Sequence, residues 1–463
     1  MLVSAQAVVK LLNTAVTILL VRYLGPHELG QYTYVLAFAY PFGALADFGL
    51  AAHAIREASR DRSRDAHILV TLRRAALLLA GLGWGVMMAV AVATRHDAAV
   101  LECLAVAGGA GILSAYATPW LVQLSVREDL HLVSLYQVAG SLLGSLATGW
   151  VLLSGGATFH LLAVSLLVNL ALVVFARILA GAQAVGPTVP YAEAVQMIRR
   201  SLPFGLLLLG FALYYRVDMV MLQWMRTEDE VGLYSAAYRF LDALLPLAAA
   251  IGRPFYPRFS HLQGHDSVEV RRLLNATWRP LFGLGLPLAI GTCFVADPLV
   301  RLAFGPEFAS AVPMLQVLIW GAIPLLLVNI PLQALNAIDR VLPLAAVYGI
   351  GLAVNVAANC VLIPLWGAFG ASAATVMCEW LTLAIVTVMV TRVFSFTLSY
   401  EGLWRYALSA GVMALCLWAS RDATLPIQIL VGGAAYLIGL VSVGYLQSND
   451  MQIVRRSWSW ARG

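Results

Sequence analysis

The sequence predicts an all-α polytopic membrane protein with about 14 transmembrane helices. Hydrophobic residues make up 61% of the 463 residues, and charged residues only 11%. Soluble domains carry about 25% charged residues, so lipid must be the solvent for most of this surface. Apolar segments of about 20 residues, the length that crosses the hydrocarbon core, recur along the whole chain. They leave room for short connections and for no large soluble domain.

The apolar segments follow one another with few interruptions. Gly and Pro fall inside several of them, which membrane helices tolerate. The two longest connections, 54–72 and 254–278, follow the second and the eighth segment. The predicted spans are 3–22, 31–53, 73–94, 98–124, 131–153, 160–180, 202–225, 232–253, 279–297, 311–336, 341–363, 369–391, 402–419 and 425–446.

Arginines in the connections predict the orientation of the chain. If the N-terminus is cytoplasmic, 21 basic residues lie in cytoplasmic connections and 5 in outer ones. Short cytoplasmic loops of membrane proteins carry such an excess. An extra or missing span would disturb the alternation, so the count supports both the number of spans and cytoplasmic termini. The five outer arginines are Arg22, Arg95, Arg226, Arg301 and Arg421.

A short repeat indicates duplication. Glu28-Leu29-Gly30-Gln31-Tyr32 and Glu230-Val231-Gly232-Leu233-Tyr234 lie 202 residues apart, before the second and the eighth span. An even number of spans separates them, so the copies would be parallel repeats. We therefore predict four parts: a six-helix lobe (1–182), a cytoplasmic linker (183–200), a second six-helix lobe (201–392), and two further helices with a cytoplasmic tail (393–463).

Four motifs, in order along the chain, resemble those of a known family. They are Arg22-Tyr23-Leu24-Gly25-Pro26-His27-Glu28-Leu29-Gly30-Gln31-Tyr32, Asp47-Phe48-Gly49-Leu50, Val231-Gly232-Leu233-Tyr234-Ser235-Ala236-Ala237-Tyr238-Arg239, and Ile363-Pro364-Leu365-Trp366-Gly367-Ala368-Phe369-Gly370-Ala371. The sequence resembles the Wzx-type polysaccharide-biosynthesis flippases of the multidrug/oligosaccharidyl-lipid/polysaccharide exporter superfamily.

The resemblance implies two six-helix lobes around a cavity open to one membrane face at a time. It also implies transfer of an undecaprenyl-pyrophosphate-linked oligosaccharide to the outer leaflet of a bacterial inner membrane, for a cell-surface polysaccharide such as O-antigen. The implied partners are the lipid-linked oligosaccharide, membrane lipid, and a polysaccharide polymerase with chain-length proteins. No nucleic-acid partner is expected.

Ionisable and polar side chains inside spans are the candidate transport residues, because they are costly in lipid and face protein or water. Gln6, Lys10, Asn13 and Thr17 share one face of the first span, which favours a hydrated lumen over simple helix packing. Shorter stripes, such as Ser372, Thr375, Glu379 and Thr382, fit either interpretation. The substrate or ion pathway is predicted to include Lys10, Asn13, Asp47, Arg216, Asp218, Arg239, Asp242 and Glu379.

Two groups among these allow alternative interpretations. In an antiparallel hairpin, Asp218 would lie level with Arg239, and Arg216 with Asp242. They would then be structural ion pairs, a network that substrate or a proton rearranges, or both. Asp47 either carries protons or caps the end of the second span, only a few residues from water.

Several functions are excluded or disfavoured. No P-loop and no catalytic triad spacing occurs, so we expect no enzyme. The five scattered cysteines form no metal motif, so we expect no cofactor, with proton or sodium coupling left open. The alternatives are a cation-coupled multidrug antiporter, a membrane-embedded glycosyltransferase or polymerase, and a lipid II flippase. The last is less favoured because the first helix lacks that branch's arginine-rich pattern.

The first testable prediction concerns topology. Reporter fusions at Asp65 and Ser267 should give cytoplasmic signals, because the arginine-rich connections determine which side stays inside. A fusion at His96, in a predicted outer connection, is the matched control and should give an outer-face signal. An outer-face signal at Asp65 or Ser267 would overturn the orientation.

Overall fold

The computed structural model describes residues 2–60, 64–181, 189–252, 255–262, 267–338, 341–394 and 401–444. Within these residues every regular element is helical, as predicted. The chain divides into two compact units, Met1–Gly232 and Leu233–Gly463, and each is described by itself. The predicted lobe boundaries at 182 and 201 do not coincide with this division and stay a prediction.

Helix α1 (Leu2–Asp47) contains the first two predicted spans. Its 46 residues would measure about 70 Å if straight, more than twice the thickness of the hydrocarbon core, about 30 Å. The chain leaves helical geometry at Gly25, with φ 67° and ψ 177°. This backbone conformation is open to glycine and costly for other residues. Gly25 lies in the predicted connection between spans 3–22 and 31–53, so α1 is two spans joined by a tight turn.

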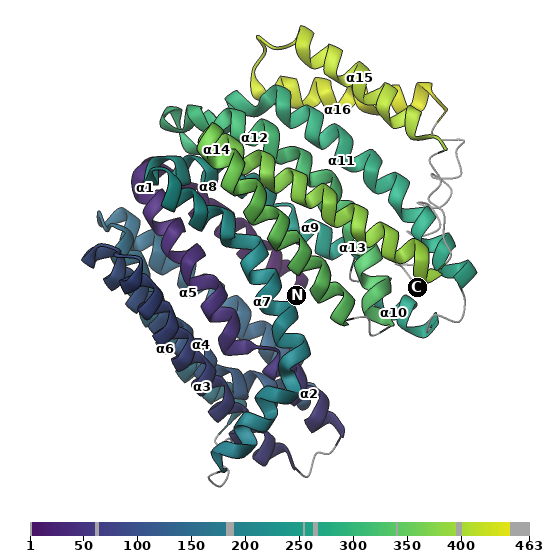
Figure 1. Ribbon diagram of the computed structural model, residues 1–463. Helices are drawn as coiled ribbons and strands as arrows, with labels where there is room; N and C mark the ends of the chain where they lie inside the picture. The colour runs from purple at the N-terminus through teal and green to yellow at the C-terminus, as the bar shows by residue number, and fades with distance from the viewer. Residues whose placement is uncertain are drawn as a thin grey trace. The chain divides into compact units, whose positions relative to one another are not determined.

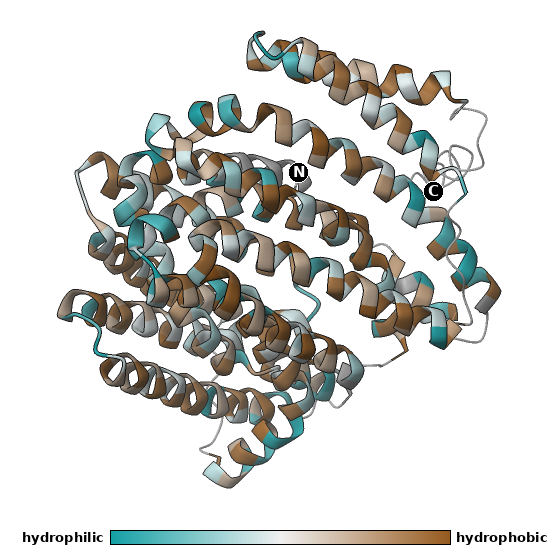
Figure 2. Ribbon diagram, turned by 45° about the horizontal axis from the view of Figure 1, so that its top comes forward, coloured by the Kyte–Doolittle hydropathy of each residue, from teal (hydrophilic) through white to brown (hydrophobic). Residues whose placement is uncertain are grey.

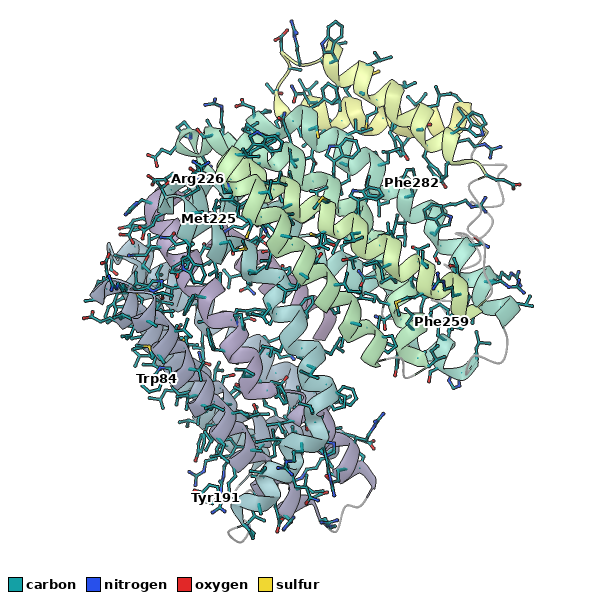
Figure 3. All side chains as sticks on the ribbon, in the orientation of Figure 1. Trp84, Tyr191, Met225, Arg226, Phe259 and Phe282 are labelled. Atoms are coloured by element: carbon teal, nitrogen blue, oxygen red, sulfur yellow. The ribbon has the colours of Figure 1, made fainter. Side chains whose placement is uncertain are left out.

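The rest of the first unit packs around α1. Helix α1 lies against α3, α5 and α7, while α4 lies between α3 and α6 (Figure 1). Helix α7 runs the length of the unit, from Tyr191 at one end to Met225 at the other (Figure 3). The further helices are α2 (Leu50–Arg60), α3 (Asp65–Ala93), α4 (Ala98–Val126), α5 (Leu130–Leu153), α6 (Thr158–Ala180) and α7 (Tyr191–Met225).

Apolar side chains cover much of the helix surfaces. Hydrophobic residues dominate the helices, and hydrophilic residues gather toward their ends and connections (Figure 2). Leu82, Trp150 and Leu153 are 62%, 67% and 91% exposed. Such exposure would be unfavourable in water and is suited to lipid. Ten helices of the described residues are long and apolar enough to cross a membrane, so this is a multi-pass membrane protein.

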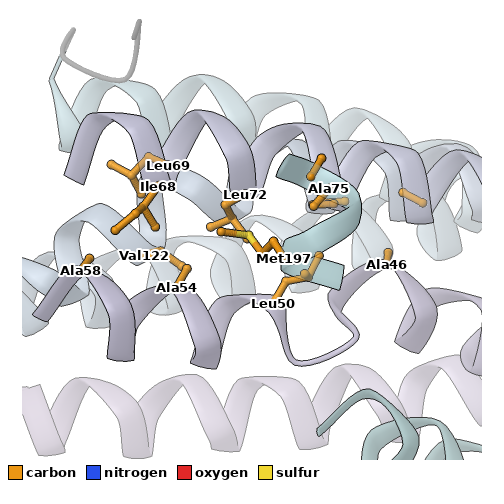
Figure 4. Close-up of a cluster of buried hydrophobic side chains, with 14 of the residues drawn as sticks. Ala46, Leu50, Ala54, Ala58, Ile68, Leu69, Leu72, Ala75, Val122 and Met197 are labelled. Atoms are coloured by element: carbon orange, nitrogen blue, oxygen red, sulfur yellow. The ribbon is translucent and has the colours of Figure 1, made fainter. Parts of the chain in front are cut away.

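A buried apolar cluster holds the arginine-rich end of the first unit, which comprises α2 and the first turns of α3 and α7 (Figure 4). Leu50, Ala54 and Ala58 recur every four residues along α2 and are at most 1% exposed. They pack with Leu72 of α3 and Met197 of α7. The sequence predicted 54–72 as a connection between spans, and the structure shows that α2 and the start of α3 make most of it helical. An amphipathic helix with an exposed arginine such as Arg56 has too little mean hydropathy to be found as a span.

The predicted linker 183–200 is partly helical as well. Residues 191–200 form the start of α7, and 182–188 lie outside the described residues. The guanidinium of Arg74 on α3 lies 4.8 Å from the ring centroid of Tyr191. The 35 residues of α7 extend over about 50 Å, so the helix continues well beyond the hydrocarbon core at this end.

The second unit is also built of helices. Predicted span 232–253 is divided between α8 and α9 by a turn at residues 243–244. Helices α15 and α16 pack on each other and on α11, where the Tyr436 hydroxyl donates to the Gly283 carbonyl over 2.5 Å. The elements are α8 (Glu228–Asp242, beginning in the first unit), α9 (Leu245–Gly252), α10 (Phe255–Leu262), α11 (Ser267–Phe304), η3 (Pro306–Ala311), α12 (Val312–Leu318), η4 (Ile319–Gly321), α13 (Ala322–Ala337), α14 (Val341–Phe394), α15 (Leu403–Ala419) and α16 (Leu425–Ser442).

Helix α14, like α1, contains two predicted spans. Its 54 residues are interrupted at Gly367, where φ is 57° and ψ is −135°. A Cβ placed on Gly370 would lie 2.1 Å from the carbonyl oxygen of Leu362, eight residues earlier. Such proximity requires the chain to fold back on itself, as predicted for the connection between spans 341–363 and 369–391.

Gly370→Ala is therefore expected to destabilise the protein. The methyl group must displace a backbone carbonyl, and overpacking of this kind costs about 1–3 kcal/mol. Gly349→Ala is the matched control on the same helix, since no atom lies within 4 Å of its Cβ position. The control should leave stability unchanged or raise it by up to about 1 kcal/mol. Thermal unfolding of the purified proteins in detergent measures both, and equal midpoints would contradict the tight turn.

Candidate functional site

A cavity of about 530 Å³ lies inside the first unit, between α1, α4, α6 and α7. Its wall is mostly apolar, and its polar groups are Tyr40 and Asp47 of α1 and Ser165 of α6. The apolar lining consists of Leu36, Ala39, Gly43, Ala44, Ala107, Ala110, Leu162, Leu208, Phe211 and Ala212. A cavity of this size and character is typical of a small-molecule or lipid site.

The sequence of α1 explains why this space is open. Leu36, Tyr40, Gly43 and Asp47 follow at intervals of four, three and four residues, so they lie on one helical face. Alanines lie between them on α1, and the facing helices add the small residues Ala107, Ala110, Ser165 and Ala212. Their side chains are too small to fill the space between four helices. A Cβ placed on Gly43 meets no atom within 4 Å, which confirms that this face borders open space.

An arginine and three aromatic rings adjoin the cavity. The Arg216 guanidinium carbon lies 4.5 Å from the ring centroid of Tyr215 and 5.9 Å from that of Tyr40. Tyr215 stacks on Phe211 with centroids 5.5 Å apart and planes at 12°. Tyr40 and Phe211 line the cavity, so the cluster forms part of its border. Cation–π contacts of this kind hold a guanidinium in place beside the rings, and Arg216 Nη1 also donates to the Met219 sulfur over 3.6 Å.

This arrangement has defined chemical capabilities. A planar guanidinium binds phosphate through two parallel hydrogen bonds. Aromatic rings present apolar faces with a polar hydroxyl in the case of tyrosine. Asp47 lies seven residues from Tyr40 on α1, about 10 Å along the helix axis. The cavity thus has a cationic, aromatic region at one level and a carboxylate at another.

Asp47 has two roles in the structure. It lines the cavity, and it accepts a hydrogen bond from the backbone N–H of Ala51 in the first turn of α2. The predicted capping role is therefore present, although the capped helix is α2. The carboxylate remains exposed, so capping does not remove it from the cavity.

The remaining predicted site residues are dispersed. The side chain of Lys10 lies outside the described residues. Asn13 accepts a hydrogen bond of 2.5 Å from the Ser145 hydroxyl of α5 and does not line the cavity. Asp218 is 2% exposed, and its carboxylate accepts the Met219 N–H over 2.8 Å. The structure thus places Asp47 in the cavity wall, sets Arg216 against the ring of the lining residue Tyr40, and leaves Asn13 elsewhere in the first unit.

Arg239, Asp242 and Glu379 belong to the second unit. Since Arg216 and Asp218 belong to the first, the pairing of these four charges stays a prediction. The γ-carbon of Glu379 would lie 3.9 Å from a Cβ on Gly321, so the side chain faces η4 of its own unit. The question of which of these groups contribute to transport is left to experiment.

The other predicted polar stripes make internal hydrogen bonds. Thr375 bonds the Tyr234 hydroxyl over 2.9 Å, and Asn359 donates to Asn355 over 2.8 Å. Both asparagines are at most 3% exposed. These contacts fit the interpretation that the stripes fix helix packing.

Sequence reasoning missed the aromatic and small residues of the site. Tyr40, Phe211 and Tyr215 carry no net charge, and aromatic residues are common in membrane spans. The helical spacing of Leu36, Tyr40, Gly43 and Asp47 was the available indication, because it combines a carboxylate with a face of small residues. Among the described residues, no group of three or more His, Cys, Asp or Glu side chains is arranged to bind a metal.

Two family models match this chain. A model described as polysaccharide biosynthesis protein matches residues 1–263. A model described as lipid II flippase MurJ matches residues 235–433. Together the matches extend over both units.

Curated relatives match shorter segments. The chain is 26% identical over 264 residues to "Probable flippase AglR" of Haloferax volcanii, which is 54% of each chain. It is 29% identical over 103 residues to "Teichuronic acid biosynthesis protein TuaB" of Bacillus subtilis, 22% of this chain and 21% of that one. The matches thus span about half the length of AglR and a fifth of TuaB.

Solved structures show the fold over nearly the whole chain. The lipid II flippase MurJ in an inward closed conformation superimposes with a TM-score of 0.76, covering 96% of this chain and 98% of that one at 14% identity. An inward-facing multidrug resistance MATE family transporter gives a TM-score of 0.65, covering 84% and 94% at 14% identity. Both belong to the fold type expected from the sequence.

Filling the cavity should block transport by this protein. Gly43→Leu places a side chain in the open space, whereas Gly81→Leu on α3 places the same side chain on an exposed face, again with no atom within 4 Å. Loss of only about 1.4 kcal/mol of substrate binding corresponds to a tenfold effect. We expect Gly43→Leu to lower transport about tenfold or more at normal membrane abundance, and Gly81→Leu to leave it unchanged. Equal activities of the two variants would exclude the cavity from the pathway.

Proposed function

The chain belongs to the polysaccharide biosynthesis protein family, whose model matches residues 1–263, and from this premise we propose that it is a flippase for a lipid-linked oligosaccharide. It would carry the glycan head group across the membrane by alternating access, while the lipid tail stays in the bilayer. The observation that carries the proposal is the cavity with Arg216, Tyr40 and Phe211 at its border.

The chemistry of such a substrate matches this cavity in three respects. A diphosphate linkage is anionic, and Arg216 offers a guanidinium held by aromatic contacts. Sugar rings have apolar faces that pack on aromatic rings, and Tyr40 and Phe211 provide them. The first isoprene units of the tail are apolar, as is most of the cavity wall.

Physical cost explains why a protein pathway is needed. A charged group at the centre of a bilayer is strongly unfavourable, and sugar hydroxyls lose their hydrogen bonds there. A protein cavity with a fixed cation lowers this cost for the head group alone. The polyprenyl tail is apolar and can stay in the bilayer throughout. A pathway that encloses the head group and is open to lipid on one side is therefore sufficient for transfer.

The multidrug antiporter is less favoured by the same electrostatics. A cationic drug would meet Arg216 at the border of the cavity, and like charges repel most strongly where solvent screening is weak. Asp47 would attract a cation, but it lies about 10 Å away along α1 and is already bonded to the α2 backbone. The position of Arg216 beside the cavity lining, with Asp47 farther along α1, therefore favours an anionic substrate.

We further propose the biological setting that the sequence predicted. The protein would lie in a bacterial inner membrane with both termini in the cytoplasm and deliver an undecaprenyl-pyrophosphate-linked oligosaccharide for O-antigen or a similar polysaccharide. A polymerase and chain-length proteins would use the product. Proton or sodium coupling, with Asp47 or Glu379 as carriers, is part of this proposal, and no enzymatic step is.

Lipid II is the second candidate substrate. The family model of the lipid II flippase MurJ matches residues 235–433, which favours this candidate in the second unit. Lipid II shares the diphosphate and the polyprenyl tail, so Arg216 would serve either substrate. Competition between the two lipids in one transport assay separates them.

Arg216→Gln tests the proposal directly. Removing the guanidinium should lower delivery of the lipid-linked oligosaccharide about tenfold or more, since hydrogen bonds to charged groups contribute about 1.5–3 kcal/mol. Arg216→Lys should retain an intermediate activity, because an ammonium keeps the charge but not the planar fork. The measurement is outer-leaflet exposure of the labelled lipid in proteoliposomes.

The control is Arg421→Gln, whose guanidinium is exposed, lies 5.8 Å from the Trp418 ring and does not line the cavity. Its transport should equal that of the unaltered protein. Normal transport by Arg216→Gln would remove this residue from the site. Transport of a cationic drug in place of the glycan lipid would establish the antiporter instead.

A further inference from the structure

The two copies of the sequence repeat contact each other at their glycines. A Cβ placed on Gly30 of α1 would lie 1.9 Å from the Glu228 carbonyl oxygen of α8. A Cβ placed on Gly232 of α8 would lie 1.8 Å from the Pro26 carbonyl oxygen of α1. Backbone therefore touches backbone, which glycine alone permits. We call residues 26–30 and 228–232, all within the first unit, the glycine contact.

The glycine contact is reciprocal. Each glycine meets the carbonyl group four residues before the other glycine, and the sequence offset of 202 relates Pro26 to Glu228 and Gly30 to Gly232. Leu29 and Val231 are related by the same offset, and both are fully buried. The repeat therefore meets itself about a local two-fold axis, with residues 26–30 and 228–232 as close as backbones come at small-residue contacts.

A histidine bridges the exposed edge of this contact. His27 Nε2 lies 3.1 Å from a Glu228 carboxylate oxygen, and His27 Nδ1 lies 3.5 Å from an Asp229 carboxylate oxygen. His27 and Asp229 are again related by the offset of 202. The His27 side chain is 67% exposed, so protons from solvent reach it. These ion pairs exist only while the imidazole is protonated.

Other charged groups nearby are Glu28, Glu230, Arg22 and Arg226. Glu28 is engaged elsewhere, since its carboxylate accepts the Thr158 hydroxyl over 2.8 Å at the start of α6. Glu230 lies beside Glu228 and Asp229 in the first turn of α8, and so adds negative charge. The negative charges that His27 meets directly are therefore those of Glu228 and Asp229.

We infer that the glycine contact is the gate at this end of the protein, and that His27 is a proton-sensitive latch on it. The inference rests on the proposed function, because only a transporter needs this end to open. The contact suits a reversible role for two reasons. Its centre is backbone against backbone at Gly30 and Gly232, and the pair of His27 with Asp229, whose side chains are 67% and 61% exposed, contributes only about 0–1 kcal/mol.

The sign of the pH effect follows from linkage. The closed gate holds protonated His27 against two carboxylates, and the open gate loses them. Acid therefore favours the closed state, and the preference disappears as rising pH deprotonates the imidazole. If this end faces the outside, as predicted, external protons would favour return of the empty carrier to the inward-open state.

Cross-linking tests the gate. His27→Cys with Asp229→Cys, in a background without the native cysteines, is treated with a short bifunctional thiol reagent. Cross-linked protein should lose transport and the unlinked double variant should retain it. The control pair is Asp297→Cys with Arg301→Cys, an exposed pair 2.8 Å apart on α11, whose cross-link should leave transport intact. Full transport by protein linked across the gate would overturn the inference.

A second measurement is independent of any glycan. Leu29→Cys should react with an impermeant maleimide only when the gate opens, and its rate is divided by that of exposed Tyr23→Cys at each pH. The ratio should be several-fold lower at about pH 5.5 than at about pH 7.5, on either side of the usual imidazole pKa of about 6.5. His27→Gln should abolish the difference. An unchanged ratio with intact His27 would remove the latch.

The two measurements distinguish failure of the inference from failure of the proposed function. If the unlinked protein moves no lipid-linked glycan but Leu29→Cys still shows the pH-dependent ratio, the gate stands and the substrate is wrong. If glycan moves normally and Leu29→Cys never reacts, the substrate stands and the gate is wrong.

Discussion

The need to satisfy every backbone hydrogen bond without water determines most of this structure. In the hydrocarbon core a helix satisfies its own N–H and C=O groups. The chain can therefore turn only near the ends of spans, at residues whose backbone adopts the turn conformation with little strain. Gly25 and Gly367 provide such turns. Each turn is so short that a single glycine leaves helical geometry, and α1 and α14 therefore each contain two spans. In the first unit, the Gly25 hairpin leads into the part of α1 that holds Gly30 at the glycine contact and Gly43 at the cavity.

Small residues serve two opposite purposes in this fold. At Gly30 and Gly232 the missing Cβ lets two backbones touch, whereas at Gly43 it leaves space that no neighbour fills. Sequence alone does not distinguish these cases, because both are glycines in apolar helices. What differs is the facing surface: another repeat copy in the first case, and small residues from three helices, Ala107, Ser165 and Ala212 among them, in the second. Close approach and open volume are thus both consequences of omitting the same methyl group.

The sequence could predict the spans because each is a local property, a run of apolar residues of sufficient length. It could also single out Asp47 and Arg216 as candidates, because a charge inside a span is rare and costly, and their part in transport stays a prediction. The α2 helix was missed because its apolar face, Leu50, Ala54 and Ala58, is interrupted by polar residues. Tyr40 and Gly43 were missed because their role depends on which helices surround them. That information arises only from tertiary packing.

The two ends of the first unit are held by different interactions, and this asymmetry bears on function. At the arginine-rich end, side chains of α2, α3, α4 and α7 are buried together (Figure 4), and separating them would expose apolar surface at about 25 cal/mol per Å². At the opposite end, backbones touch at Gly30 and Gly232, and the exposed His27 pairs with Asp229. Protonation can therefore act directly on this contact, whereas the apolar cluster at the arginine-rich end contains no titratable side chain. In a transporter, the end that depends on protonation is the one suited to sense the medium it faces.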